Sequence, residues 1–244
     1  MTPQAVEAAQ DADVSEIVTA LAGAAEAPVR RGRGGYRLPF RPSGLAPPLP
    51  FLLRRGSVSF RAGDWRGALA ASRVFAHRNA AGNSVAIGRN FRFDRLEVVF
   101  CGVGNSLVIG DDVNWSGAIR IRGHGVSVSI GSRCDSKEGR IVAAGASISL
   151  GTDCLIAEDV ELRSSDIHRI YDRESGELLN APAPIVIGRR TWLCGGAMVL
   201  KGVELAEGTI LGSRAVVAAS VEEPRCVVAG NPARIVRRGV IWKR

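Results

Sequence analysis

Aliphatic side chains return at every sixth position in the C-terminal part of the chain. They stand at Ile187, Leu193, Val199, Leu205, Leu211 and Val217. A small or β-branched residue follows each of them by four positions, at Thr191, Ala197, Val203, Thr209, Ala215 and Val221. A repeat this short cannot bury its apolar side alone, so successive repeats must stack into a solenoid. Three hexads make one coil with three flat sides, and the pattern predicts a β-helix with a narrow triangular core.

Longer repeats of the same kind occupy the middle of the chain. The first two read GNSVAIG and GNSLVIG. The copies end at Gly88, Gly110, Gly131 and Gly151, and a partial copy, PIVIG, ends at Gly188. Most neighbouring copies are roughly 20 residues apart, slightly more than three hexads, so we expect the extra residues to form loops at the corners. The sequence thus predicts one all-β domain over residues 57–238 and a C-terminal tail at 239–244.

The first 56 residues have a different composition. Residues 1–27 are rich in alanine, and their apolar side chains are spaced for one face of a short helix. Residues 28–56 combine Pro, Gly and Arg with no acidic residue. We predict a partly helical and flexible leader, in preference to a basic surface that holds an anionic membrane or polymer. Nucleic acid is not an expected partner, because aromatic platforms for its bases are scarce.

The remaining composition limits the compartment. The chain has 244 residues and a formal net charge of +8, and it contains no apolar run of the roughly 20 residues that cross a bilayer and no signal-peptide pattern. Its five cysteines include no CxxC pair, and Cys134 and Cys154 fall where small residues would fill the core. These features predict a reduced, cytoplasmic protein, whose basic leader would allow peripheral contact with the inner membrane.

The regular pattern is interrupted after Leu162. The next aliphatic position is expected at 168 but arrives at Ile187. The inserted loop, at about 164–184, begins SSDIHRIYD and contains His168, one of three histidines. Long excursions from a rigid scaffold usually carry function. This loop is therefore the first place to search for a catalytic residue.

Several features follow one another in the second half of the chain. They are the string SSDIHRIYDRESGELLNAPAPIVIG, then Trp192, then the hexads, then AGNPARIVRR at 229–238. Over about residues 80–238 the chain resembles the left-handed β-helix acyltransferases of the hexapeptide-repeat superfamily, and among them the O-acetyltransferases of capsule and lipopolysaccharide biosynthesis. The resemblance implies a left-handed β-helix and a homotrimer with active sites between subunits. It also implies acetyl-CoA as the acyl donor and no metal.

The resemblance further implies direct transfer of an acetyl group from a thioester to a hydroxyl. The hydroxyl must lose its proton as it attacks, and a histidine imidazole suits this task because it titrates near neutrality. His168 is therefore the predicted general base, with Asp166 as a partner that orients the other ring nitrogen. The remaining histidines, His77 and His124, lack a comparable context.

The donor site also follows from the resemblance, position by position. The matching residues are Trp192, Gly195, Ser213, Ala218, Ala219, Arg234 and Arg237. Guanidinium groups suit phosphates, so Arg234 and Arg237 are expected at the nucleotide end of acetyl-CoA. Trp192 would shape the acyl or acceptor pocket, although a Trp beside a corner could equally serve packing. Cys194 stands where the superfamily usually has glycine, and we interpret it as a tolerated small residue and not as a nucleophile.

The predicted function is O-acetyl transfer from acetyl-CoA to a hydroxyl of a bacterial surface glycan or its sugar precursor. One alternative is a small-molecule acetyltransferase of the same superfamily, acting on a simple sugar, serine or an antibiotic. A zinc carbonic anhydrase on this scaffold would need three convergent histidines, whereas His77 precedes the repeats. The last alternative is a β-helix that serves in assembly without activity, and the intact loop around His168 argues against it.

Overall fold

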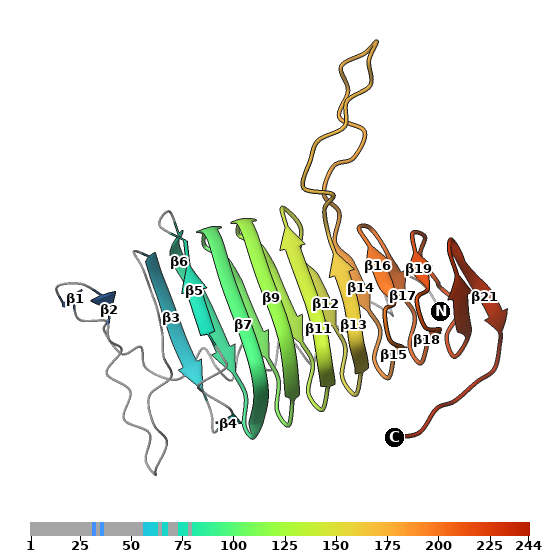
Figure 1. The fold of residues 1–244 in the computed structure, drawn as a ribbon, viewed down its shortest axis with the longest axis horizontal. Coiled ribbons are helices and arrows are strands. Elements are labelled where there is room, and N and C mark those ends of the chain that lie inside the picture. Colours follow the sequence, from blue (N-terminus) through green and yellow to red (C-terminus); the bar gives the residue numbers. More distant parts are fainter. Residues whose placement is uncertain (1–30, 33–34, 37–55, 63–64, 68–72, 78–79) are drawn as a thin grey trace.

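The computed structural model describes residues 31–32, 35–36, 56–62, 65–67, 73–77 and 80–244. Most of the leader, with its expected helix and linker, lies outside these ranges. The described chain is a solenoid of parallel strands stacked along one axis, with one long excursion on its flank (Figure 1). Within the same ranges, no helix has the length and apolar character needed to cross a bilayer. The predicted all-β solenoid is confirmed.

Strands β3 to β21 belong to one wound sheet of 19 strands. Separately, β1 (Arg31–Gly32) and β2 (Gly35–Tyr36) form an antiparallel pair. The first side of the solenoid consists of β3 (Gly56–Ala62), β6 (Ala80–Ile87), β8 (Ser106–Ile109), β10 (Ser127–Ile130), β12 (Ile148–Leu150), β14 (Ile185–Ile187) and β17 (Glu204–Leu205). Each of these strands pairs in parallel with the next, so their aliphatic residues form continuous buried rows.

The second and third sides share long strands that turn a corner. These are β7 (Phe91–Val103), β9 (Asn114–His124), β11 (Asp135–Ala144) and β13 (Leu155–Arg163). Before them, β4 (Trp65–Gly67) and β5 (Arg73–Ala76) pair with the two halves of β7. After them, the second side continues as β15 (Trp192–Leu193), β18 (Ile210–Leu211) and β20 (Val227–Gly230), and the third side as β16 (Met198–Leu200) and β19 (Val216–Val217). The final strand, β21 (Ala233–Arg237), runs antiparallel to β20.

These sides meet at three columns of corners, numbered here from the coil that begins with β14. The first corner holds residues 188–191, the second holds 194–197 and the third holds 201–203. Corners of neighbouring coils stack on them, because the flanking strands pair in parallel from coil to coil. Outside the long excursion and the C-terminal tail, the residues from β6 onward can therefore be assigned to a side or a corner column.

The predicted hexad residues fill the interior. All six aliphatic positions from Ile187 to Val217 are buried, as are the six small or β-branched positions from Thr191 to Val221. The two buried threonines satisfy their hydroxyls on backbone carbonyls: Thr191 Oγ1 donates to Gly188 at 2.6 Å, and Thr209 Oγ1 donates to Ala206 at 2.7 Å. Cys134 and Cys154 are also buried, which confirms their interpretation as core residues.

The glycine that ends each longer repeat is required by the stacking of coils. A methyl group built on Gly131 would lie 2.6 Å from the backbone of Gly151, and one built on Gly151 would lie 2.6 Å from the backbone of Arg189. Real Cβ atoms do not approach backbone this closely, so glycine is needed where these longer coils meet at the first corner. The repeat signature seen in the sequence thus has a direct steric cause.

The asparagines of the repeats bridge neighbouring coils from inside the third corner. Asn83 Oδ1 accepts the backbone N–H of Asn105 at 2.9 Å, and Asn105 Oδ1 accepts that of Val126 at 2.9 Å. Both side chains are buried. They satisfy backbone donors that the turn leaves without a strand partner, which explains why GNS recurs in the first two repeats.

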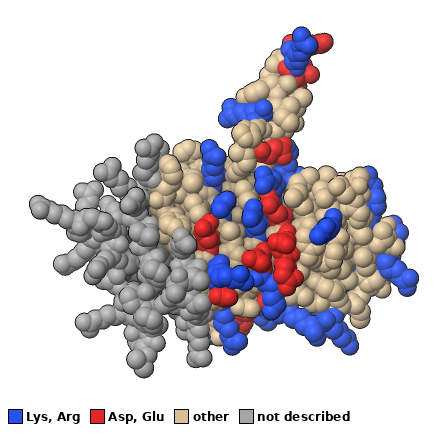
Figure 2. Space-filling model, viewed as in Figure 1, with Lys and Arg blue, Asp and Glu red and all other residues tan. Residues whose placement is uncertain are grey.

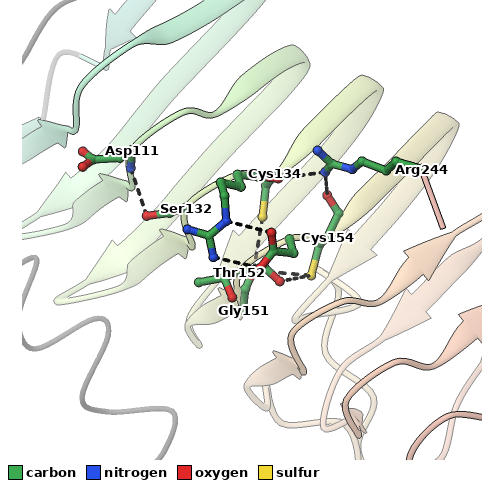
Figure 3. Close-up of polar contacts among 9 residues, drawn as sticks. Asp111, Ser132, Cys134, Gly151, Thr152, Cys154 and Arg244 are labelled. Atoms are coloured by element: carbon green, nitrogen blue, oxygen red, sulfur yellow. Dashed lines mark hydrogen bonds and ion pairs between the residues drawn. The ribbon is translucent and has the colours of Figure 1, made fainter. Parts of the chain in front are cut away.

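The C-terminal tail runs back along the first corner. Trp242 Nε1 donates to the carbonyl of Arg190 at 2.7 Å, and its ring lies 6.0 Å from that of Trp192 between centroids. Arg244 donates to the carbonyls of Arg133 at 2.7 Å and Cys154 at 3.0 Å. Figure 3 shows this guanidinium beside the stacked corners that carry Cys134 and Cys154. The tail therefore contacts coils that lie far from it in sequence.

Candidate active site

The excursion between β13 and β14 forms an arm, defined here as residues 164–184, that projects from the third corner (Figure 1). Its two legs run antiparallel: Tyr171 bridges to Leu178, and the N–H of Leu179 donates to the carbonyl of Ile170 at 2.8 Å. The root is closed by a bond from the Ala183 N–H to the Ser164 carbonyl at 3.1 Å. The arm is thus an ordered hairpin.

The arm's tip is a turn built around one carboxylate. Asp172 Oδ1 accepts the backbone N–H groups of Glu174 at 2.9 Å and Ser175 at 2.7 Å, and also the Ser175 hydroxyl at 3.0 Å. These bonds, those from Ser175 first, lower the pKa of Asp172. Gly176 follows with φ of 71°, a left-handed conformation that suits glycine. The DRESG segment of the sequence therefore encodes the reversal of the chain.

His168 lies near the root of the arm and is exposed. Its backbone is held on both sides, because its N–H donates to the Asp166 carbonyl at 2.8 Å and its carbonyl accepts from Asn180 Nδ2 at 2.8 Å. In the described part of the chain, no hydrogen bond reaches its imidazole. The imidazole is therefore available to bond a group that is not among the described residues of this chain.

The carboxylate of Asp166, predicted to orient that ring, is bonded to other groups among the described residues. Its Oδ2 atom forms an ion pair with Lys201 and accepts from Asn180 Nδ2 at 2.9 Å. The bond from Lys201, followed by that from Asn180, lowers the pKa of Asp166. A carboxyl pKa that is lowered on folding adds stability above its unfolded value and loses it only as the pH falls through the folded value. This contact therefore persists through the neutral range and weakens only in acid.

The residue between Asp166 and His168 has a strained backbone. Ile167 has φ of 69°, in the left-handed region that β-branched residues avoid. Such a conformation costs about 1–3 kcal/mol and persists only where the surroundings enforce it. The Ile167 N–H donates to Ser165 Oγ at 3.1 Å, and Ser165 is itself buried. The turn that presents His168 is consequently a constrained one.

The residues predicted for acetyl-CoA fall into three groups. Gly195 and Ser213 stack at the second corner, where the N–H of Arg214 donates to the Gly195 carbonyl at 2.9 Å. Ala218 and Ala219 follow β19 and are exposed at the third corner, two coils beyond the one from which the arm leaves. These two groups flank the third side of the solenoid.

The third group lies on the second side. In the sheet, Trp192 aligns with Ile210, Ile210 with Val227, and Val227 with Arg237. Trp192 is half-buried and tilted against Trp242 of the tail. Arg234 and Arg237 are exposed on β21. Among described residues, no hydrogen bond or ion pair joins any of these groups to His168.

A charged groove that sequence reasoning missed lies on the long strands. It has a volume of about 420 Å³ and is lined partly by Arg95, Glu97, Arg140 and Glu161. Figure 2 shows acidic and basic side chains side by side over these strands. Glu161 pairs with Arg163 at 2.5 Å and with Arg140 at 3.8 Å. Because the charged lining side chains come from β7, β11 and β13, which stack in space but are separated in sequence, no local motif in the sequence marks this groove.

The described residues contain no group of three or more His, Cys, Asp or Glu side chains that could hold a metal ion. The stacked Cys134 and Cys154 thiols are instead bonded to backbone carbonyls, both including that of Gly151.

The fold and the arm define a class of protein: a hexapeptide-repeat β-solenoid with a histidine-bearing excursion between coils. Comparison with known proteins agrees with this class. The chain is 36% identical over 163 residues to the polysialic acid O-acetyltransferase of Neisseria meningitidis, covering 66% of this chain and 76% of that protein. No family model matches the chain.

Two solved structures share the fold over most of its length. The polysialic-acid-specific acetyltransferase NeuO superposes with a TM-score of 0.72 at 29% identity, covering 80% of this chain and 82% of that one. The polysialic acid O-acetyltransferase OatWY gives 0.69 at 30% identity, covering 80% and 90%. The chain belongs to the hexapeptide-repeat β-helix acetyltransferase family. The predicted family and enzyme class, an acetyl-CoA-dependent O-acetyltransferase, are confirmed.

Proposed function

We propose that this protein O-acetylates a polysialic-acid-type capsule glycan, with His168 as general base. The acceptor is supported by the relative and both solved structures above, which are named for polysialic acid. The base is supported by the placement of His168, which stands at the root of an ordered arm with its backbone held and its imidazole exposed. This placement is the observation that carries the proposal.

The chemistry needs one proton transfer and no covalent enzyme intermediate. Acetyl-CoA supplies an activated acetyl thioester. His168 removes the proton from a glycan hydroxyl as the hydroxyl oxygen attacks the acetyl carbon, and the carbon–sulfur bond then breaks. The resulting imidazolium returns the proton to the departing thiolate. Burial raises the pKa of the Cys194 thiol, which disfavours the thiolate that a nucleophile would need.

The arm carries an apolar surface suited to contact with a second copy of the chain. The arm exposes four large apolar side chains: Ile167, Ile170, Tyr171 and Leu179, each 41–60% exposed. Exposed apolar residues gathered on one element are typical of a protein interface. We infer a homotrimer in which each arm packs against a neighbour, so that His168 of one copy faces the Gly195 and Ser213 corner of the next.

The donor would lie along the outside of the third side. Gly195 and Ser213 present backbone and a small side chain at one edge of this side, and Ala218 and Ala219 do so at the other. Such small residues let a ligand approach the main chain closely. Arg234 and Arg237 on β21 would take the phosphates.

An acceptor panel tests the proposed substrate. Purified protein is given acetyl-CoA with polysialic acid, a neutral polysaccharide, free sialic acid, a simple neutral sugar or chloramphenicol, and released thiol is measured. We expect acetyl transfer to polysialic acid at the highest kcat/KM, and ester formation confirmed by mass. Transfer to the simple sugar or the antibiotic alone would assign the protein to the small-molecule branch, and no transfer at all would favour an assembly role.

A complementation experiment tests the shared site. The His168→Ala variant and a Gly195→Trp variant are each expected to be inactive alone. When they are co-expressed, mixed trimers contain sites that take a normal arm from one copy and a normal corner from another. We expect activity to return. Mixed trimers that stay inactive, formed from variants that fold and assemble, would place each site within a single chain.

A further inference from the structure

One side chain holds the root of the arm together, and it lies on the leg opposite His168. The Asn180 amide donates through Nδ2 to Asp166 Oδ2 at 2.9 Å and to the His168 carbonyl at 2.8 Å. Its Oδ1 atom accepts the backbone N–H of Ile170 at 2.7 Å. Both donors and the acceptor are thus engaged, and a carboxylate in this position could accept but not donate.

Lys201 connects this arrangement to the solenoid. It lies at the third corner of the coil after the one from which the arm leaves, and its ammonium group pairs with Asp166. The same group lies 3.4 Å from the backbone carbonyl of Asn180, to which it donates. A rigid coil, Lys201, the two arm residues and the backbone of His168 therefore form one connected series of contacts.

We infer that Asn180 is a positioning residue for His168, anchored to the solenoid through Lys201 and Asp166. This inference rests on the proposed role of His168 as the base. Asn180 fixes the carbonyl of His168, and the Asp166 carbonyl fixes its N–H at 2.8 Å. With both peptide groups held, the Cα–Cβ direction of His168 is set, and with it the region that the imidazole can reach.

The strain at Ile167 explains why the hydrogen bonds from Asn180 are needed. A β-branched residue with φ of 69° will relax toward an ordinary conformation unless its neighbours are held. Asn180 bonds to the residues on both sides of it, Asp166 and His168. Loss of these bonds would let the turn relax and move the imidazole. A displacement of about 1 Å at a reacting group can reduce a rate about 100-fold.

The first test removes the amide. We expect Asn180→Ala to lower kcat by about 10- to 100-fold while KM for acetyl-CoA stays within about twofold, because the donor site is not touched. Asn180→Asp keeps the size and the acceptor but loses both donors, so its defect should be similar. Glu174→Ala, at the tip of the same arm, is the matched control and should keep the wild-type rate.

A double-variant cycle asks whether Asn180 acts through His168. If it does, adding Asn180→Ala to His168→Ala should change the residual rate by less than about twofold, because the group being positioned is already absent. If the two losses multiply, or if Asn180→Ala alone has the wild-type kcat, the inference is wrong and the proposed base stands. If His168→Ala itself keeps the wild-type rate, the proposed function has failed first.

Variants of Lys201 test the same inference if the Asn180 variants fold poorly. Lys201→Met removes the cation that holds Asp166, whereas Lys201→Arg keeps it. We expect Lys201→Met to lower kcat and to speed amide hydrogen exchange in the arm at residues 165–171, and Lys201→Arg to restore most of both. Equal rates and equal exchange in Lys201→Met and wild type would overturn the anchoring role.

Discussion

Two adjacent glycines at the second corner have different physical roles, and this difference gives a sharp test of the donor site. Gly196 has φ of 71°, and a methyl group built on it would lie 3.0 Å from Arg214 Cγ. A residue with a side chain costs about 1–2 kcal/mol in this left-handed conformation. Gly195 has no positive φ, and a methyl group there would lie 3.7 Å from the carbonyl oxygen of Glu158, an ordinary contact.

We therefore expect Gly196→Ala to lower the stability and Gly195→Ala to lower the affinity for acetyl-CoA. Gly196→Ala should lower Tm by about 2–8 °C, from a loss of about 1–2 kcal/mol in a chain of this size, with little change in KM. Gly195→Ala should keep the wild-type Tm. If acetyl-CoA lies against Gly195, the added methyl overpacks that contact by about 1–3 kcal/mol, which raises KM for acetyl-CoA about 5- to 150-fold.

The assay combines thermal melts with initial rates at varied acetyl-CoA concentration. The wild type and both variants are compared at a fixed, saturating acceptor concentration, so that a change in KM reports the donor alone. If Gly195→Ala has the wild-type KM and kcat, the donor does not contact this corner. If Gly195→Ala melts as early as Gly196→Ala, the methyl group at position 195 does not fit the corner, and the two glycines do not have different roles.

Three further predictions concern the phosphates, the thiol and the core. Changing both Arg234 and Arg237 to Ala should raise KM for acetyl-CoA about tenfold or more, since each charge-assisted contact contributes about 1.5–3 kcal/mol. The difference in KM between variant and wild type should become smaller as salt screens the charges. An unchanged KM in low salt would show that these residues do not bind the donor. Cys194→Ser should retain activity, whereas loss of activity with acetyl-cysteine found in the wild type would overturn direct transfer. Asn105→Ala should lower the free energy of unfolding by about 1–3 kcal/mol in chemical denaturation, because it leaves the N–H of Val126 buried and unpaired; an unchanged midpoint would contradict this.

The fold could be predicted from the sequence because its coils stack along a single axis. Each coil contacts mainly its neighbours, so the spacing of Ile187 and the later hexad residues fixed both the register and the core. The repeat glycines carried the same information, since a side chain at Gly151 would collide with the next coil. The buried Asn83 and Asn105 were visible in the GNS repeats, but their bonds to neighbouring coils depend on a corner geometry that spacing alone does not define.

The site was predicted less completely because it depends on contacts across the arm. The position of His168 in an interruption of the repeat marked it as a candidate. Asp166 was expected to orient the imidazole because it is close in sequence, yet its carboxylate faces Lys201 and Asn180. These two partners are 35 and 14 residues away from Asp166, and only the hairpin of the arm brings them together.

The tail was likewise more structured than its composition indicated. A short basic segment reads as solvated, but the indole of Trp242 and the guanidinium of Arg244 bond to carbonyls at the first corner. Those carbonyls belong to residues between 52 and 111 positions earlier. No periodic signal encodes such a contact, because it is made once.

The most direct test of the central claim is acetyl transfer from acetyl-CoA to polysialic acid by His168→Ala, with His124→Ala as the matched control. Both histidines are exposed, and only His168 stands on the arm. We expect His168→Ala to fold and assemble normally but to lose at least about 100-fold in kcat, whereas His124→Ala keeps the wild-type rate. A folded His168→Ala variant that transfers acetyl groups at the wild-type rate would contradict the account.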